Sequence, residues 1–283
     1  MKKILVTGGA GFIGSHLCQR LAMSNSYEVY SLDNYSTGTV NNHVSKVTYL
    51  TGDTKDISKL ISFNPDFVYH LGEYSRVEQS FEDIDKVWRS NKDGIFAVLQ
   101  FCRNAGAKII YAGSSTKFGD GGLGRSQSPY AWTKASNTEL VENYGKWFDV
   151  PYAITYFYNV YGAREISEGR YATLIALFIK KYLRGEELTV VSPGTQKRNF
   201  THVNDIVDGL IMVGEKGYGD EFGIGSPEAF SVIEIAQMFD AKIKILPERK
   251  GNRMTAEVVT SKTEALGWSP KYSIKNYIDD MTK

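Results

Sequence analysis

The chain has 283 residues, of which 42% are hydrophobic and 23% are charged. This composition suits a soluble globular protein with one large domain, or with one domain and a smaller lobe. The formal net charge of +1 gives no general electrostatic reason to expect nucleic acid or an anionic membrane as a partner. We find no signal-peptide pattern and no long uncharged apolar run, and therefore expect a cytoplasmic protein without membrane segments.

The cysteines and histidines do not form a metal-binding pattern. Cys18 and Cys102 lack a C-x-x-C spacing and lie in apolar helical patterns, so we expect buried, reduced thiols. The four histidines lack ligand spacing. The sequence therefore predicts no metal site.

The first element in the chain is a short apolar run at residues 3–7, typical of a buried parallel strand. It leads directly into a glycine-rich turn, in which Gly9, Gly11 and Gly14 fit the pattern G-x-G-x-x-G. These glycines allow a tight turn, close approach of the backbone to a pyrophosphate, and close packing of helix on strand. Free amides at the start of the following helix would face the anion.

A second strand at residues 28–32 ends in Asp33, about 20 residues beyond the last glycine, where a ribose-binding carboxylate is expected. Asp33 would repel a 2′-phosphate, and Asn34 supplies no cation to hold one. The predicted cofactor is therefore NAD rather than NADP. The alternative is a glycine-rich turn with a surface aspartate, which the strand, glycines, helix and acidic residue together make the weaker interpretation.

The following elements alternate between strands and helices, which predicts an α/β fold with a doubly wound parallel sheet. Strands are predicted at 47–50, 66–71, 108–112 and 152–157, and long helices at 84–104 and 128–148. We assign residues 1–162 to an NAD-binding Rossmann domain. We expect residues 163–283 to form a smaller lobe, of which about 199–216 packs back on the Rossmann domain. This lobe has predicted helices at 170–184 and 204–215 and a strand at 188–191.

Residues with reactive side chains follow the predicted strand ends, where open parallel sheets bind ligands. Ser114 follows the strand at 108–112, and Tyr130 and Lys134 lie four residues apart, on one face of the next helix. A nearby ammonium favours a phenolate over a phenol, so Lys134 can make Tyr130 a base. With NAD alongside, this trio fits removal of a hydride from a secondary alcohol. An exposed tyrosine–lysine pair is the alternative.

Taken as an ordered set, the motifs resemble those of the extended short-chain dehydrogenase/reductases of the nucleotide-sugar epimerase/dehydratase family, and most closely the UDP-sugar 4-epimerases. They lie at residues 7–14, 33–38, 52–53, 70–72, Asn91, 114–119, Tyr130 with Lys134, 159–162, 198–203 and 266–270. The likeness extends over nearly the whole chain.

This resemblance implies roles for individual residues. Ser114, Tyr130 and Lys134 would be catalytic. The residues that would bind NAD are Gly8, Gly11, Phe12, Ile13, Gly14, Asp33, Asn34, Ser36, Thr37, Gly38, Asp53, Thr54, Leu71, Gly72, Asn91, Tyr130 and Lys134. A nucleotide-sugar substrate would be bound by Ser114, Asn159, Arg198 and Arg249. The family often forms homodimers through two long helices, here those that carry Asn91 and Tyr130.

The resemblance also narrows the reaction. Dehydratases of the family place an Asp-Glu pair after the catalytic hydroxyl, and the related decarboxylases keep a Glu there, whereas this chain has Ser115 and Thr116. Neither side chain is a carboxylic acid, which favours epimerisation at C4 of a UDP-linked hexose through a transient 4-keto intermediate. The alternatives are a nucleotide-sugar 4-ketoreductase or dehydrogenase with the same trio, and a non-catalytic NAD or nucleotide-sugar sensor.

Three positions depart from the family pattern. The segment between Gly119 and Tyr130 is shorter than usual. Glu73 and Tyr74 replace small residues, which would bring a carboxylate near the nicotinamide or the sugar. Tyr156 stands where an arginine is usual. We expect these differences to affect the substrate more than the cofactor.

Overall fold

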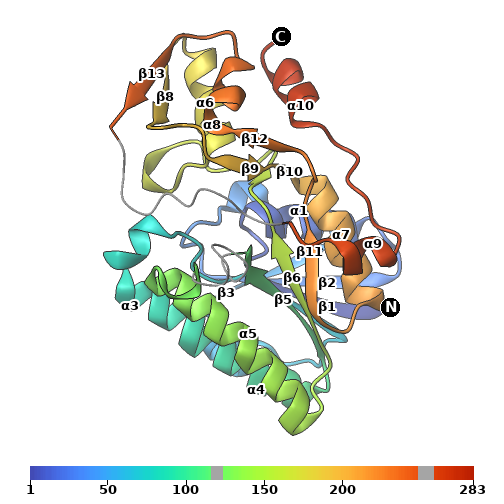
Figure 1. The fold of residues 1–283 in the computed structure, drawn as a ribbon. Coiled ribbons are helices and arrows are strands. Elements are labelled where there is room, and N and C mark those ends of the chain that lie inside the picture. The colour runs from blue at the N-terminus through green and yellow to red at the C-terminus, as the bar shows by residue number, and fades with distance from the viewer. Residues whose placement is uncertain (116–123, 248–257) are drawn as a thin grey trace.

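A seven-stranded parallel sheet forms the centre of the fold in the computed structural model, which describes residues 1–115, 124–247 and 258–283. Its strand order is β11-β6-β5-β4-β1-β2-β3 (Figure 1). The strands are β1 (Lys2–Thr7), β2 (Tyr27–Asp33), β3 (Val47–Thr51), β4 (Phe67–His70), β5 (Lys108–Ser114), β6 (Tyr152–Phe157) and β11 (Gly219–Ile224). The α/β prediction is confirmed. The order reverses between β1 and β4, where such sheets bind ligands outside the strand ends.

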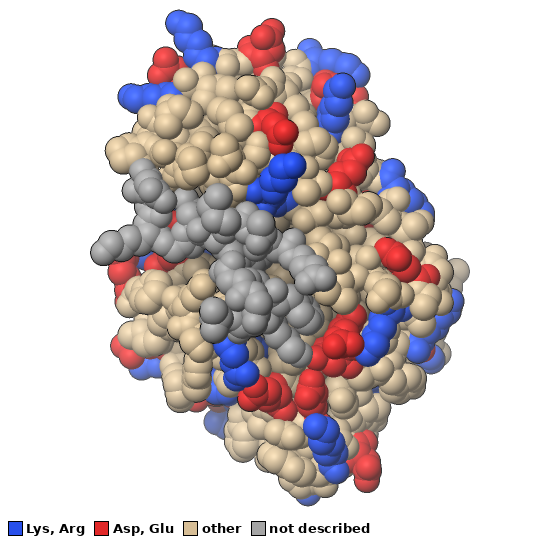
Figure 2. Space-filling view, in the orientation of Figure 1, with Lys and Arg blue, Asp and Glu red and all other residues tan. Residues whose placement is uncertain are grey.

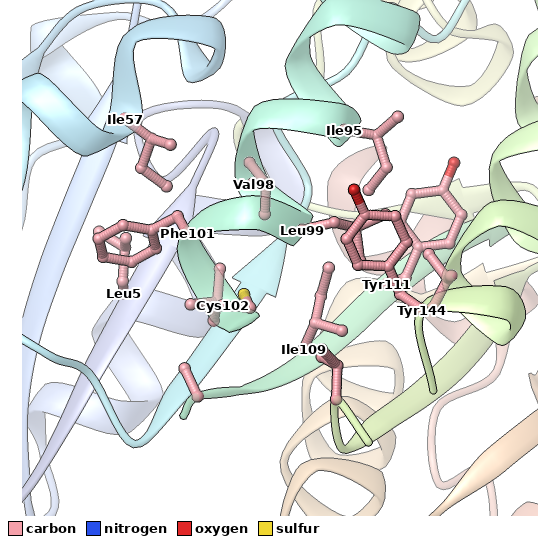
Figure 3. Packing of buried hydrophobic residues seen from close by; sticks show 14 of the residues in the cluster. Leu5, Ile57, Ile95, Val98, Leu99, Phe101, Cys102, Ile109, Tyr111 and Tyr144 are labelled. Carbon is pink, nitrogen blue, oxygen red and sulfur yellow. The ribbon is translucent and has the colours of Figure 1, made fainter. Parts of the chain in front are cut away.

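Helices cover both faces of the sheet because the strand side chains alternate between them. Leu5 points into a core shared with α4 and α5, whereas Ile4 and Val6 point into a core shared with α1 and α7. Figure 3 shows the first of these cores, where Leu99 of α4 lies near Tyr111 of β5 and Tyr144 of α5. The helices are α1 (Phe12–Ala22), α4 (Gly94–Ala105), α5 (Pro129–Phe148) and α7 (Val203–Lys216).

The two long helices predicted at 84–104 and 128–148 differ in regularity. The α5 helix begins where expected, because the Ser128 hydroxyl accepts a hydrogen bond from the Ala131 amide and Pro129 occupies the first turn. The other helix is interrupted by η4 (Trp88–Asp93), a π-helical segment between α3 (Ile84–Val87) and α4. Segments of this kind widen the turn and often occur at functional sites.

Much of the chain beyond residue 162 forms a smaller lobe with its own apolar core. Phe178, Leu188 and Phe239 are buried in it. Its elements are α6 (Leu174–Leu183), β8 (Leu188–Val191), β9 (Lys197–Asn199), β12 (Ala229–Ser231), α8 (Val232–Gln237), β13 (Ile243–Leu246) and α10 (Ile274–Met281). The α6 helix starts four residues later than predicted, because a separate turn, η6 (Gly169–Tyr171), and the extended residue Ala172 precede it.

Other segments after residue 162 return to the sheet. The α7 helix packs beside α1, and β11 adds a seventh strand that the sequence analysis did not predict. The Trp268 indole donates a hydrogen bond of 2.9 Å to the Asp205 carbonyl in the same core. A domain boundary at residue 162 remains a prediction, since this later part of the chain contributes to both cores.

The remaining short elements connect these layers. They are η1 (Val40–Asn42), η2 (Thr54–Asp56), α2 (Ile57–Leu60), η3 (Glu78–Phe81), β7 (Val160–Tyr161), β10 (Thr201–His202) and α9 (Ser261–Ala265). Cys18 and Cys102 are both buried, free thiols. Within the described ranges, no helix combines the length and apolar character needed to cross a membrane. Acidic and basic side chains are interspersed over the face shown in Figure 2.

We expect the substitution Leu99→Ala to lower the free energy of unfolding by about 2–5 kcal/mol, because it leaves a cavity at a fully buried site. Chemical denaturation monitored by circular dichroism would measure this loss. Leu183 is 65% exposed, so Leu183→Ala is a matched control that should change stability by less than about 0.5 kcal/mol. Equal effects of the two substitutions would contradict the described packing.

Candidate active site at the carboxyl edge of the sheet

The glycine turn after β1 has the geometry of an anion cradle. Gly8 has a φ of +74°, and a Cβ added at Gly14 would lie 2.1 Å from the Gly8 carbonyl oxygen. The α1 helix begins at Phe12 after Gly11, and no side chain caps its first turn. The amides at its N-terminus can therefore receive a pyrophosphate, so the turn fits a dinucleotide.

Asp33 lies at the end of β2, beside this turn. Its carboxylate accepts hydrogen bonds from the amides of Ala10, at 2.9 Å, and Tyr35, at 2.8 Å. A Cβ at Gly38 would lie 3.0 Å from the same carboxylate, so Ser36, Thr37 and Gly38 follow in a loop that returns to the glycine turn. A carboxylate in this position suits the hydroxyls of an adenosine ribose.

Two further residues predicted to bind NAD meet next to Asp33. The Asn34 side-chain amide donates a hydrogen bond of 2.6 Å to Asp53, which directly precedes Thr54, the first residue of η2.

On the other side of β1, the Gly72 amide donates to the Thr7 hydroxyl at 3.1 Å. Leu71 and Gly72 therefore lie against the glycine turn, and their contact with NAD remains a prediction.

Asn91 lies in the π-helical segment and is fully buried. Its side-chain oxygen accepts a hydrogen bond from the Tyr74 amide at 2.7 Å. Its side-chain nitrogen donates to the Tyr74 carbonyl and to the Thr133 hydroxyl, both at 3.1 Å. Asn91 thus joins the loop after β4 to α5, and a direct contact between Asn91 and NAD remains a prediction.

The proposed catalytic residues gather at the end of β5. Ser114 is the last residue of that strand and is 8% exposed. Tyr130 is half-buried in the first turn of α5, within electrostatic range of Tyr111. One turn later, the Lys134 ammonium lies 4.6 Å from the centre of the Tyr111 ring. Side chains from β5 and α5 therefore meet at this end of the sheet, and the catalytic roles of Ser114, Tyr130 and Lys134 remain predictions.

The ammonium of Lys134 forms a buried ion pair with Glu73. The two side chains are 6% and 3% exposed, and Lys134 also donates a hydrogen bond to the Ala112 carbonyl. The sequence analysis expected the Glu73 carboxylate to lie near the nicotinamide or the sugar. The structure encloses it beside Lys134, one of the residues predicted to bind NAD, and its nearness to the nicotinamide or the sugar stays a prediction.

Every side of the Glu73 carboxylate is occupied. The Tyr111 hydroxyl donates to Oε2 at 3.0 Å, the Asn137 amide donates to Oε1 at 3.1 Å, and His70 Nε2 lies 3.4 Å from Oε1. Burial by itself raises the pKa of the Glu73 carboxyl, but the positive charge of Lys134, together with His70 and the hydrogen bond from Lys134, outweighs it and lowers the pKa to about 2. Glu73 is therefore ionised.

Arg76 lies on the same loop, and the charges of Tyr130, Tyr74 and Tyr171 partly oppose the effect of burial on its pKa. Its guanidinium donates to the Tyr171 carbonyl at 2.9 Å and weakly to Ser75. Its Nε is buried and has no hydrogen-bond partner in the described part of the chain. Burial lowers the pKa of Arg76, but a guanidinium stays charged at neutral pH.

A group of contacts joins the two lobes beside this loop. The hydroxyls of Tyr74 and Tyr171 both donate to one oxygen of Asp83, each at 2.9 Å. Nearby, the Gln79 side chain donates to the Arg170 carbonyl at 2.9 Å. Since Tyr171 and Arg170 belong to the smaller lobe, these bonds fix its position over the strand ends.

The predicted substrate-binding residues come from neighbouring segments. Asn159 is exposed with a φ of +35°, and its amide donates to the Asn199 carbonyl at 3.0 Å. Arg198 precedes Asn199 on β9. The structure thus brings Asn159 close to residues 198–199, while Arg249 lies outside the described residues.

Tyr156 does not take the place of an arginine at the site, which corrects the expectation that it would affect the substrate. Its side chain is fully buried in the sheet core, and its hydroxyl donates to Asp220 at 2.6 Å. Burial, reinforced by the negative charge of Asp220, raises the pKa of Tyr156. Its role is packing.

The sequence analysis missed Arg76, Tyr111 and Asn137 as parts of the site. A signal existed for Asn137, which lies three residues after Lys134 and so shares its helix face. No local pattern marked Tyr111 or Arg76, because only the assembled sheet brings them to Glu73 and Tyr130. Among the described residues, no three His, Cys, Asp or Glu side chains are grouped to hold a metal ion.

Comparison with known proteins identifies the family. The model of the NAD dependent epimerase/dehydratase family matches residues 4–225. The chain belongs to this family. Its cofactor is accordingly NAD, which the glycine turn and Asp33 are built to receive.

The relatives that this chain resembles are named for different reactions. The chain is 30% identical to UDP-glucuronic acid decarboxylase 6 of Arabidopsis thaliana, over 96% of this chain and 85% of that protein. It is also 30% identical to a putative UDP-glucose 4-epimerase of Methanocaldococcus jannaschii, over 97% and 95% of the two chains. A solved UDP-glucose 4-epimerase of Thermotoga maritima, with UDP-glucose, has a TM-score of 0.91 at 27% identity, covering 99% of this chain and 97% of that one.

We expect Gly14→Ala to weaken NAD binding at least about tenfold, because the added methyl would collide with the Gly8 carbonyl in the anion cradle. Calorimetric titration of the cofactor-stripped protein would measure the affinity. Gly169→Ala is a suitable control, since its Cβ would meet nothing within 4 Å although φ is +73°. This substitution should strain the backbone at residue 169 but keep the NAD affinity within about twofold of that of the wild type.

Proposed function

We propose that the protein interconverts C4 epimers of a nucleotide-linked hexose, with UDP-glucose and UDP-galactose or their N-acetylated forms as substrates. The observation that carries this proposal is that Ser114 ends β5 and that Lys134 of α5 donates a hydrogen bond to the Ala112 carbonyl of the same strand, at the sheet edge that also holds the glycine turn. The end-to-end likeness to a solved UDP-glucose 4-epimerase supports it.

In this proposal, Tyr130 takes the proton of the C4 hydroxyl while Ser114 donates a hydrogen bond to the same oxygen. When bound, NAD accepts the hydride from C4 and later returns it. The oxidised hexose rotates in the site after it loses the hydride and before it regains it, so that the hydride returns to the opposite face of C4. Tyr130 then gives its proton back to the oxygen, and the protein and cofactor are unchanged.

Dehydration and decarboxylation fit the described residues less well. Ser115, next to Ser114, is not an acid, and Thr116 lies outside the described residues. Glu73, the acid that is paired with Lys134, could serve as a replacement, but its carboxylate is ionised and enclosed by Lys134, Tyr111 and Asn137. It therefore has no proton to donate in an elimination.

The diphosphate end of the substrate would lie along Asn159 and Arg198, with Arg249 as a further predicted partner. A planar guanidinium can bind phosphate oxygens in pairs, which suits Arg198 to this role. Arg198 lies on β9, at the boundary of the two lobes. The next residue, Asn199, accepts a hydrogen bond at its carbonyl from the side chain of the exposed Asn159.

We also propose that the protein is a homodimer, paired through α4 and α5, which lie side by side (Figure 1). Large apolar side chains are exposed on this side: Trp88, Phe96 and Trp132 are 47%, 52% and 43% exposed. Trp88 and Trp132 stack with ring centres 6.0 Å apart. Apolar side chains that gather on one face of a monomer are typical of an interaction surface.

The direct test of function is to incubate the protein with UDP-, GDP-, CDP- and dTDP-linked sugars and to identify products by NMR. We expect C4 epimers with no net change in NADH. Tyr130→Phe should lower kcat by about 10²–10⁴, because the proton acceptor is lost. The control Tyr218→Phe alters a tyrosine that is 67% exposed, far from these residues in the sequence, and should have no effect.

Other products would replace this proposal with a defined alternative. Net oxidation or reduction of the cofactor in each turnover would indicate a dehydrogenase or 4-ketoreductase. Release of carbon dioxide from UDP-glucuronate would indicate a decarboxylase. Full activity of Tyr130→Phe, or binding without turnover of any nucleotide sugar, would contradict the proposed mechanism.

For the dimer, we expect light scattering after size exclusion to give about twice the chain mass of 31.7 kDa. Phe96→Arg should shift the protein to the monomer, because it places a charge in the apolar interface. Leu183→Arg, on α6, changes an apolar residue in the other lobe that is 65% exposed, more than Phe96, and should leave the mass unchanged. A monomeric wild type would contradict this part of the proposal.

A further inference from the structure

We propose that Asn42 is a positioning residue of the NAD site, which acts through Ala10 and keeps the carbonyl of the peptide before α1 turned away from the cofactor pyrophosphate. In this role Asn42 acts without touching NAD itself. The inference concerns cofactor binding, so it does not depend on which reaction the protein catalyses.

The first observation is that the Ala10 carbonyl has two hydrogen-bond donors. It accepts one bond from the Asn42 side-chain amide at 2.9 Å and another from the Thr39 backbone amide at 3.1 Å. A carbonyl oxygen has two lone pairs. Both lone pairs of the Ala10 oxygen are therefore used by the loop that follows β2.

The same peptide is also held at its nitrogen. The Gly11 amide donates to the Gly8 carbonyl at 3.1 Å. Because the Ala10 carbonyl and the Gly11 amide belong to one planar peptide, contacts at its two ends fix its orientation. Ala10 is fully buried, so solvent does not compete for its carbonyl.

The orientation of this peptide matters because α1 begins directly after it. The helix starts at Phe12, and no side chain caps its first turn. The free amides of that turn attract an anion, whereas a carbonyl oxygen turned into the same space would repel one. The two hydrogen bonds to Ala10 therefore keep an acceptor out of the anion cradle.

The backbone that carries Asn42 is itself held in place. Asn42 is the last residue of η1, and its amide donates to the Thr39 carbonyl at 3.0 Å. The Thr39 hydroxyl accepts a bond of 3.3 Å from the Asn41 amide. The next residue, His43, stacks on Tyr49 of β3 with ring centres 3.6 Å apart. The Asn42 side chain thus extends to the glycine turn from a fixed support.

Ala10 also joins this loop to Asp33. Its amide donates to the Asp33 carboxylate at 2.9 Å, while its carbonyl binds Asn42. Between these two residues the chain is tightly folded, since Tyr35 has a φ of +57°, which persists only where surrounding contacts fix it. A Cβ at Gly38 would lie 3.0 Å from the Ala10 carbonyl carbon. The loop therefore lies directly against the glycine turn, and Asn42 fastens its far end.

The alternative is that Asn42 only stabilises the loop beside the adenosine ribose. The two roles differ in the part of NAD that they affect. A loosened loop would weaken adenosine and ADP alike, whereas a turned peptide at Ala10 would weaken only ligands that carry a pyrophosphate. Adenosine and ADP are therefore the probes that separate the two roles.

The experiment measures the dissociation constants of NAD, ADP and adenosine for the cofactor-stripped protein, by calorimetry and, for adenosine, by competition with NAD. We expect Asn42→Ala to weaken the binding of NAD and ADP about tenfold, because the peptide loses one of its two donors. Adenosine affinity should stay within about twofold of that of the wild type.

A second variant, Asn42→Asp, has nearly the same shape as the wild type. When ionised, it should weaken NAD more than Asn42→Ala, because a carboxylate repels both the Ala10 oxygen and the pyrophosphate. A protonated carboxyl can donate to Ala10 again. The ratio of the NAD dissociation constants of Asn42→Asp and Asn42→Ala should therefore fall from about pH 7.5 to about pH 5.

Two comparisons isolate the effect of residue 42. The neighbouring titratable groups are Asp33, Tyr35 and His43, and both variants keep them, so the ratio removes their contribution. The matched control is Asn41→Ala, which changes an exposed asparagine of the same turn. It should leave all three dissociation constants within about twofold.

Equal losses of ADP and adenosine affinity in Asn42→Ala would overturn the inference, and so would an unchanged NAD affinity or a ratio that does not fall with pH. The comparison of ADP with adenosine in Asn42→Asp tests it even where Asn42→Ala does not fold. A product other than a C4 epimer would instead overturn the proposed function and leave these binding results intact.

Discussion

The buried ion pair between Glu73 and Lys134 is the interaction on which the site depends. It joins the loop after β4 to α5, and through Tyr111 it also fixes β5. Removing one partner of such a pair costs about 3–5 kcal/mol, because the other charge is left unpaired in an environment of low polarity. The pair therefore ties the stability of this edge of the sheet to the arrangement of the proposed catalytic residues.

The parallel sheet explains why these residues meet at all. Each strand ends at the same edge, so the loops after β1, β2, β4 and β5 lie next to one another although they are far apart in the chain. The glycine turn and Asp33 form the cofactor side of this edge, and Ser114 and Tyr130 form the reactive side. Contacts such as Tyr171 with Asp83 then hold the smaller lobe over it.

Local patterns predicted the cofactor side better than the reactive side. The glycine turn and Asp33 were predictable because part of their geometry depends on neighbouring residues: Gly8 has a positive φ, and Asp33 accepts a hydrogen bond from the Tyr35 amide two positions on. The partner of Lys134 was not predictable, because Glu73 lies 61 positions away and only the pairing of β4 with β5 brings it close. For the same reason, Tyr156 was wrongly expected at the substrate, although it packs in the core.

The sequence by itself determined most of the strands and helices and the dinucleotide turn, because these follow from periodicity or from residues close together in the chain. The reactive trio is a proposal that the sequence also supplied. The family resemblance of those motifs was also contained in the sequence. Only the tertiary structure decided that β11 completes the sheet, that Asn91 binds the backbone of Tyr74, and that Glu73 encloses Lys134. These contacts arise between distant segments, where burial and charge compensation, rather than local propensity, select the partner.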